Sequence, residues 1–390
     1  MAVKNKKQNN SGLRHEMAKI KVVGVGGGGG NVISRMRKEL FKGVDFIAIN
    51  TDTQDLELCN ADVKIHIGKN LTKGLGTGMN PDLGRQAAEE TRAEIVEAIK
   101  GADLVFITAG LGGGTGTGAA PVVAEAAKEM GALTIAVVTK PFSFEGAQRS
   151  RIAQEGMMKL KDKVDTLLVV PNDRIFTIIE KDTTLIKAFE AVDDILRSAV
   201  QGIAELIAMP GIINVDFADV KAIMENAGSA LVGIGISSGQ DRAMTAVMQA
   251  VNSPLLEVSI EGAKGVLFGV SGPKDLRMNE IHEIAKIISE AVDPSAKIIF
   301  GAYHDRQMKA GQLKVTIIAT GFNGSSLKGA GNSPLSNLFN TASERKQPEL
   351  LINRKEEKED MDEPRPRVKQ ELPKKSDVWD IPTFLRKKKK

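Results

Sequence analysis

Short, wholly apolar segments alternate with longer segments of helical periodicity over residues 19–172, and this alternation limits the possible folds more than any other feature. Strands that are apolar on both faces need helices on both sides, which is typical of a parallel, doubly wound sheet. Such a sheet binds its ligands beyond the carboxyl ends of its strands. The predicted helices cover residues 31–40, 82–100, 119–130 and 149–164, and the predicted strands are KIKVVGVG, VDFIAIN, VKIHIG, DLVFITAG, LTIAVVTKP and TLLVVPN.

The strand DLVFITAG leads into the segment Gly112–Gly118, which contains five glycines and two threonines ahead of a predicted helix. Residues without Cβ expose successive backbone N–H groups, and a helix N-terminus adds about half a positive charge. We therefore predict a nest for a di- or triphosphate, to which the hydroxyls of Thr115 and Thr117 add donors. A tightly packed turn would need only one or two glycines. The chain has no G-x-x-x-x-G-K-[ST] segment, so this is not a P-loop.

A second glycine-rich turn, GVGGGGGN, follows the first predicted strand. Its Gly24, Gly26 and Gly29 match G-x-G-x-x-G, and Asp52 stands at a later strand end, so a nicotinamide-dependent oxidoreductase is an alternative. One such turn is enough for a pyrophosphate, however, and two turns on one sheet favour a nucleoside triphosphate. No histidine or cysteine arrangement suited to hydride transfer is apparent in the sequence.

Composition narrows the class of protein further. The 53 lysines and arginines against 49 acidic residues, a net charge of +4, are too balanced to indicate general nucleic-acid binding. A single cysteine, Cys59, excludes an internal disulfide framework and suits a reducing cytosol. The four histidines lack metal-ligand spacing, and no segment has the length of a membrane span. We expect a soluble cytosolic protein without a transmembrane segment.

The second half of the chain has a different pattern. Residues 183–208 form one predicted helix, either an ordinary core helix or a connection across a domain, with its apolar stripe at Leu185, Phe189, Val192, Leu196, Ile203 and Leu206. A smaller α+β domain with a mixed sheet is predicted over 209–324. Its helices include RAMTAVMQAV and MNEIHEIAKIISEAV, and its strands GVLFGVSG, AKIIFGAYHD and KVTIIATGF, of which the last two have a short connection.

The two ends of the chain are polar. Residues 1–18 are predicted to be a flexible extension and residues 325–376, with dense mixed charge, a disordered linker. Residues 377–390, DVWDIPTFLRKKKK, bring back apolar side chains and are predicted to be a docking peptide with a basic end, the alternative being a tail without a role. The final lysines fit contact with an acidic partner or anionic lipid as well as they fit a solvated end.

Several segments together resemble one family. GGGTGTG after a strand is similar to the signature of the tubulin superfamily, and the wider set resembles the bacterial cell-division FtsZ family over about residues 18–322. That set is GVGGGGGNVISRM, INTD, GLGTGMNPDLGRQAAEE, PFSFEGAQR, NVDFADVKAIM and the terminal DIPTFLR. Thr77 and Met79 depart from the family pattern, in which alanine is more usual, within the loop Gly76–Asn80 that would sense the γ-phosphate. The resemblance implies a Rossmann-like GTP-binding domain over 19–182.

The resemblance also implies roles for individual residues. Glu145 and Arg149 would bind near the ribose and phosphate, and Asn31, Asn172 and Asp193 would read the guanine edge, since amides and carboxylates can accept from its N–H groups. For Asn172 a turn or helix cap, and for Asp193 a solvated acid, are the alternatives. The residues that would cradle the phosphates of GTP or GDP are Gly26, Gly27, Gly28, Gly29, Gly30, Gly112, Gly113, Gly114, Thr115, Gly116, Thr117 and Gly118.

Hydrolysis needs charge neutralisation and a positioned water, and Mg²⁺ held through the phosphates would supply part of the first. The candidate acids and amide, Asn214, Asp216 and Asp219, lie in GIINVDFAD. Asp216 alone would equally be a helix N-cap. By resemblance, this loop enters the nucleotide site of the next subunit, and such a head-to-tail contact gives open filaments.

The resulting hypothesis is a self-assembling GTPase of the division ring at midcell, on the inner face of the cell membrane. Adaptor proteins would bind its C-terminal peptide. The alternatives are a dinucleotide oxidoreductase and a scaffold that binds GTP without hydrolysing it.

Overall fold

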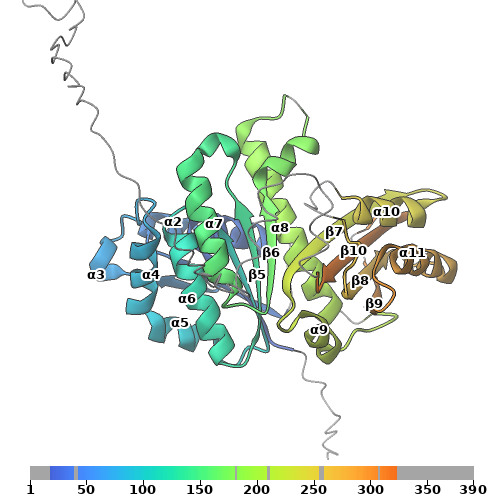
Figure 1. Ribbon diagram of the computed structural model, residues 1–390, viewed down its shortest axis with the longest axis horizontal. Helices are drawn as coiled ribbons and strands as arrows, with labels where there is room; N and C mark the ends of the chain where they lie inside the picture. Colours follow the sequence, from blue (N-terminus) through green and yellow to red (C-terminus); the bar gives the residue numbers. More distant parts are fainter. Residues whose placement is uncertain are drawn as a thin grey trace, which may run out of the picture. The chain divides into compact units, whose positions relative to one another are not determined.

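The computed structural model describes residues 18–38, 43–180, 182–208, 211–253, 259–305 and 308–322. The predicted linker, docking peptide and almost all of the N-terminal extension lie outside these residues. The described residues form a mixed α/β fold around one sheet of ten strands in the order β3-β2-β1-β4-β5-β6-β7-β10-β8-β9 (Figure 1). These strands are β1 (Ile20–Val25), β2 (Val44–Asn50), β3 (Val63–His66), β4 (Leu104–Gly110), β5 (Leu133–Lys140), β6 (Thr166–Pro171), β7 (Gly228–Ser238), β8 (Gly265–Gly272), β9 (Lys297–His304) and β10 (Gln312–Thr320).

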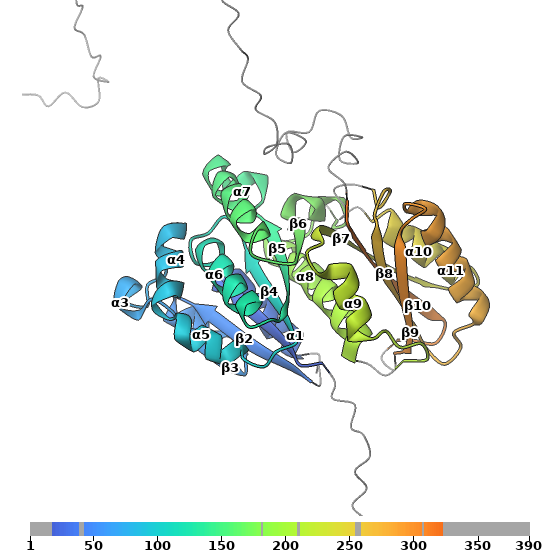
Figure 2. The same cartoon turned by 60° about the horizontal axis from the view of Figure 1, so that its bottom comes forward.

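Strands β1 to β6 are parallel, as the apolar segments predict. Successive side chains point to opposite faces, so Val22 and Val23 belong to different cores. One core contains α1 (Gly26–Lys38) and α8 (Leu185–Ala208). The other lies under α4 (Pro81–Glu90), α5 (Arg92–Ile99), α6 (Thr115–Glu129) and α7 (Ala147–Lys161) (Figure 2). Short helices follow β2 and β3 as α2 (Thr53–Leu58) and α3 (Lys69–Thr72), and 3₁₀ turns lie at Ser143–Glu145 and Asn172–Thr177.

The C-terminal part of the sheet is mixed, as predicted. Strand β10 is antiparallel to β7 and β8, whereas β8 is parallel to β9. Helices α10 (Arg242–Val251) and α11 (Met278–Ala291) pack on one face, while α8 and α9 (Phe217–Met224) pack on the other. β9 and β10 follow each other in the chain, but β8 lies between them in the sheet.

Several local predictions need correction. Helix α1 begins at Gly26 and not at Asn31, because the glycines themselves form its first turns against β1 and β4. Helix α6 likewise begins at Thr115 and not at residue 119, so the last four residues of the glycine-rich segment are helical. The single helix predicted over 82–100 is two helices that meet at Thr91. The Thr91 hydroxyl bonds back to the Ala87 carbonyl and accepts from the Gly68 N–H, which ties the break to the loop after β3. Strand β7 was not predicted, because its glycines interrupt the apolar pattern.

Candidate functional site

The two glycine-rich turns meet at the carboxyl ends of β1 and β4. Gly26 has a φ of +71°, and a Cβ built on it would lie 2.9 Å from the Gly116 backbone nitrogen. A Cβ on Gly116 would lie 2.8 Å from the Gly110 carbonyl, and one on Gly29 2.4 Å from the Thr108 carbonyl. Side chains would therefore push the two turns apart, and glycine is what allows α1 and α6 to begin side by side.

Thr115 joins this pair of turns to a third segment. Its hydroxyl lies 2.7 Å from that of Thr51, after β2, and 3.2 Å from that of Thr77. A Cβ on Gly114 would lie 2.1 Å from the Thr77 hydroxyl, so the loop 76–80 is packed directly on the second glycine turn. The Asn80 side chain accepts from the N–H groups of Asp82 and Leu83 and caps α4. Three loops thus converge where the sequence predicts phosphate binding.

Within the second turn, the side chains and the backbone have different tasks. The Thr117 hydroxyl accepts from the Gly112 N–H at 2.9 Å, and both threonines of the turn are buried, so their hydroxyls hold the loop in shape. Gly113 is the open position, since a Cβ there would meet nothing within 4 Å. Helix α6 has no side-chain cap at Gly114 and no acid in its first turn, so no carboxylate of that turn offsets the positive end of its dipole.

Two of the implied ribose and phosphate ligands lie beside this turn. Glu145 and Arg149 form an ion pair one helical turn apart, and Glu145 also accepts from the Phe142 N–H. The Arg149 carbonyl is 3.1 Å from the Cβ position of Gly112. The first turns of α7 therefore bring this ion pair next to the second glycine turn.

The three residues implied for guanine come from three elements. Asn31 is exposed on α1, Asp193 lies on α8, and Asn172 begins the turn after β6. Asp193 accepts from the Arg35 guanidinium at 3.1 Å, an ion pair that sequence reasoning missed, although Arg35 is one turn beyond Asn31. Burial is the main reason why the pKa of Asp193 is raised to about 6. Asn172 is 6% exposed, and its Oδ1 has no hydrogen-bond partner within the described residues.

A further carboxylate lies against the first turn and was also missed. Asp55, on α2, accepts from the Asn50 amide at 2.7 Å, and its Oδ2 is 3.1 Å from the Cβ position of Gly27. Burial, together with the nearby Asp52 carboxylate, raises the pKa of Asp55. Asp52 itself caps α2. The sequence offered one signal for Asp55, namely that it is an acidic residue shortly after the end of a predicted strand.

Asn214, Asp216 and Asp219 are not part of this cluster. They lie on the loop that follows α8 and on the first turn of α9, and all three are exposed. The 15 residues from Asp193 to the end of α8 span about 22 Å of helix, and the loop begins beyond that end. Asp216 does cap α9, with a 3.4 Å contact to the Ala218 N–H.

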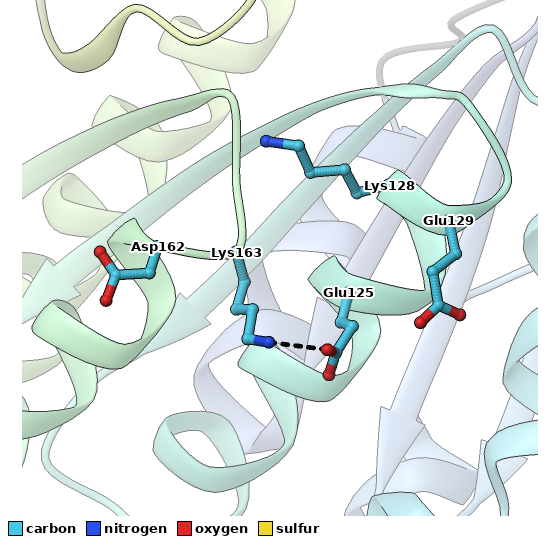
Figure 3. Close-up of a pocket in the computed structure, with 5 residues that line it drawn as sticks. All are labelled: Glu125, Lys128, Glu129, Asp162 and Lys163. Atoms are coloured by element: carbon cyan, nitrogen blue, oxygen red, sulfur yellow. Dashed lines mark hydrogen bonds and ion pairs between the residues drawn. The ribbon is translucent and has the colours of Figure 1, made fainter.

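An open groove of about 340 Å³ lies at the opposite end of α6 from the glycines (Figure 3). Its lining consists of Glu125, Lys128, Glu129, Asp162 and Lys163. Lys163 binds Glu125 at 2.6 Å, and Lys128 binds the buried Asp165 at 3.1 Å. Because the groove lies at the C-terminal end of α6, it is separate from the glycine turns at the other end.

Among the described residues, no helix is long and apolar enough to cross a membrane, and no three histidine, cysteine or acidic side chains gather as a metal site. Family profiles match most of this region. The profile of the Tubulin/FtsZ family, GTPase domain, matches residues 19–180, and that of the FtsZ family, C-terminal domain, matches residues 228–323.

Solved structures agree with these matches. A structure titled as an empty FtsZ dimer from M. jannaschii is 51% identical with a TM-score of 0.76, over 79% of this chain and 90% of that one. The GDP-bound monomer of CetZ1 from Haloferax volcanii is 25% identical with a TM-score of 0.69, over 78% and 94%. CetZ2 from the same organism, titled as a GTPgS-bound protofilament, shares the fold at 23% identity, with a TM-score of 0.67 over 77% and 92%. The parallel sheet, the paired glycine turns and these matches have one explanation: the chain belongs to the FtsZ family of tubulin/FtsZ GTPases.

Proposed function

We propose that the chain binds GTP in the cradle formed by Gly26–Gly30 and Gly112–Gly118 and hydrolyses it only after head-to-tail assembly. The open space at Gly113 and the uncapped first turn of α6 suit phosphate oxygens. The partnerless, buried Oδ1 of Asn172 suits an N–H donor of a guanine base. Asp193 would accept from the same edge, and Asn31 would contact it from α1. Glu145 and Arg149 would lie at the ribose and phosphates.

The observation that carries the assembly step is the distance between the two groups of residues. Asn214, Asp216 and Asp219 are exposed at the far end of α8, where they can meet the nucleotide of a second chain. There the carboxylates would orient the attacking water. Mg²⁺ would be held mainly through the phosphates, where it neutralises charge that develops in phosphoryl transfer. One half-site at each end makes the contact heterologous and the product a filament.

The wider role that we propose is a cytoplasmic filament of the division ring, assembled at midcell. In this proposal, residues 19–182 form the GTP-binding domain, residues 183–208 the central helix, and residues 209–324 the C-terminal α+β domain. The peptide 377–390 would bind membrane-anchoring and regulatory division proteins, with residues 325–376 as its tether. That linker and that peptide lie outside the described residues, so this part is supported by the sequence and the family alone.

Mixing two inactive variants tests the shared site. Gly113→Val should not bind GTP, while Asp216→Ala should bind GTP and hydrolyse it poorly. A mixture of the two should regain hydrolysis, because the nucleotide of an Asp216→Ala chain can meet the intact loop of a Gly113→Val chain. Random pairing of equal amounts makes about a quarter of the contacts complete.

In the matched control, the Gly113→Val chain is replaced by a chain that carries both Gly113→Val and Asp216→Ala. This chain has no intact loop that could complete the site of the Asp216→Ala chain. Phosphate release should then stay at the level of Asp216→Ala alone. If the first mixture is no faster than this control, the site is contained within one chain and the proposal is wrong. The same assay in GDP or NAD should give neither sedimentable filaments nor phosphate.

A further inference from the structure

A buried carboxylate connects α8 to the C-terminal strands. Glu205 is 6% exposed, and its Oε2 accepts from the Tyr303 hydroxyl at 2.7 Å and from the Lys314 ammonium at 3.0 Å. Its Oε1 accepts from the Gln201 amide at 2.6 Å. A buried carboxylate with all its hydrogen-bond donors in place holds those donors in a fixed geometry. Loss of one donor would leave part of the buried charge without a partner, which costs free energy.

These contacts continue along α8 toward the nucleotide end. Arg197 donates to the Gln201 side chain at 3.1 Å and pairs with Asp194 at 3.3 Å. Asp194 is next to Asp193, and its charge contributes to the raised pKa of that carboxyl. Polar side chains spaced three and four residues apart thus link the guanine-facing turn of α8 to Glu205.

The strand that carries Tyr303 also holds the loop 211–219. The Ala302 carbonyl accepts from the Ile212 N–H at 2.7 Å, and the Ala302 N–H donates to the Ile213 carbonyl at 3.0 Å. A Cβ on Gly301 would lie 2.9 Å from a Val215 methyl carbon, so the loop is packed on β9 as well as hydrogen-bonded to it. Three successive residues of β9 therefore contact the loop or α8.

We propose that Tyr303 is a positioning residue for GTP hydrolysis: its bond to Glu205 fixes β9, and through β9 the loop bearing Asn214 and Asp216, against α8. The inference rests on the proposed role of that loop. Tyr303 is 3% exposed, so its hydroxyl can act on the reaction only through buried neighbours, of which Glu205 accepts its proton. Burial and the Glu205 carboxylate raise the pKa of Tyr303 well above its usual range, which keeps the phenol protonated as the donor.

Tyr303→Phe removes the hydroxyl and preserves the ring. We expect GTP affinity and filament yield within about twofold of the unmodified chain and a kcat lower by about 3- to 10-fold, as loss of one bond to a charged group implies. Ile299→Val is the matched control, because it weakens packing of the same strand against the shared core without touching Glu205. If kcat fell equally in Tyr303→Phe and Ile299→Val, Tyr303 would only stabilise the fold and would not position the loop.

Glu205→Gln provides a second route with a readout independent of hydrolysis. The chain has one tyrosine, so the absorbance of tyrosinate during an alkaline titration reports Tyr303 alone. Its pKa should fall in Glu205→Gln, and kcat should fall with it. If kcat is unchanged in both Tyr303→Phe and Glu205→Gln while Asp216→Asn hydrolyses GTP slowly, the positioning role of Tyr303 is wrong. The shared site would still stand. If Asp216→Asn also hydrolyses normally, the proposed function itself is wrong.

Discussion

The two ends of α8 are built in opposite ways. At the glycine end the two turns pack backbone against backbone, most of their residues are buried, and a Cβ would meet neighbours at 2 to 3 Å at Gly114 and Gly116. At the other end Asn214, Asp216 and Asp219 are exposed side chains on a loop. Under the proposed function, the backbone cradle would be complete within one chain, whereas the exposed carboxylates would act on the nucleotide of a second chain. The contrast would then let one chain bind GTP and still depend on a neighbour to hydrolyse it.

The largest effect is expected at the cradle. Gly113→Val should weaken GTP binding by more than about 100-fold, since the side chain would occupy space that the phosphates need. Gly113 is a cleaner site than Gly116, where a side chain would also collide with the Gly110 carbonyl and disturb folding. Nucleotide binding by filter assay measures the loss. Gly272→Ala is the control, because its Cβ meets only ordinary contacts on β8; near-normal affinity in Gly113→Val would contradict the cradle.

At the loop, Asp216→Asn should lower hydrolysis by about 10²-fold while GTP affinity stays within twofold. Asparagine is as good an N-cap as aspartate, so α9 keeps its cap and only the charge is lost. Phosphate release from preassembled filaments and equilibrium GTP binding are the two measurements. If GTP affinity and phosphate release fell by the same factor, Asp216 would belong to the nucleotide site of its own chain. The proposed difference between the two ends of α8 would then be wrong.

Asp193 should give nucleotide binding at the glycine end a dependence on pH. If its carboxylate accepts from guanine, GTP affinity should fall by up to about tenfold per pH unit below its pKa of about 6. Asp193→Asn should bind more weakly at pH 7 and lose this slope. Affinity of the unmodified chain that is constant between pH 7 and pH 5 would exclude the carboxylate from the base site.

The same pKa predicts the sign of a stability effect. Between the usual value of 3.8 and about 6, the native chain holds the Asp193 proton that the unfolded chain has lost. The free energy of unfolding should therefore fall as pH rises through this window, by up to about 3 kcal/mol relative to Asp193→Asn. Urea unfolding of both proteins without nucleotide at pH 4.5 and pH 7 measures the difference, of which about 2 kcal/mol falls between these two pH values. A difference that does not change with pH would show that Asp193 titrates normally.

The smallest effect is expected at Thr77. Thr77→Ala removes a 3.2 Å contact with the Thr115 hydroxyl, so unfolding free energy should fall by about 1 kcal/mol or less. GTP affinity should change by less than about threefold, because Thr115 keeps its contact with Thr51. A thermal melt and a GTP titration suffice. A tenfold loss of affinity would make the loop 76–80 part of the binding surface in its own right.

The parts of the fold that sequence could predict are those fixed by local pattern. The apolar strands β1 to β6 and the two glycine turns follow from residue types within a few positions of each other. The ion pair of Arg35 with Asp193, the Asp55 carboxylate at Gly27 and the Tyr303–Glu205 bond join residues far apart in the chain. No periodicity encodes such pairs. The position of β8 between β9 and β10 in the sheet likewise cannot be read from the order of the strands in the chain.

The single ten-stranded sheet has one narrow seam. β6 and β7 are joined by three residue pairs, Thr166 with Gly228, Leu167 with Ser229 and Leu168 with Ala230, whereas β7 and β10 share nine. Cooperative units of a protein separate where the fewest backbone bonds must break. Amide hydrogens at this junction should exchange with deuterium earlier than those of the ladders on either side. If such molecules assemble in a row, we expect tension along the row to open this junction before the ladders on either side.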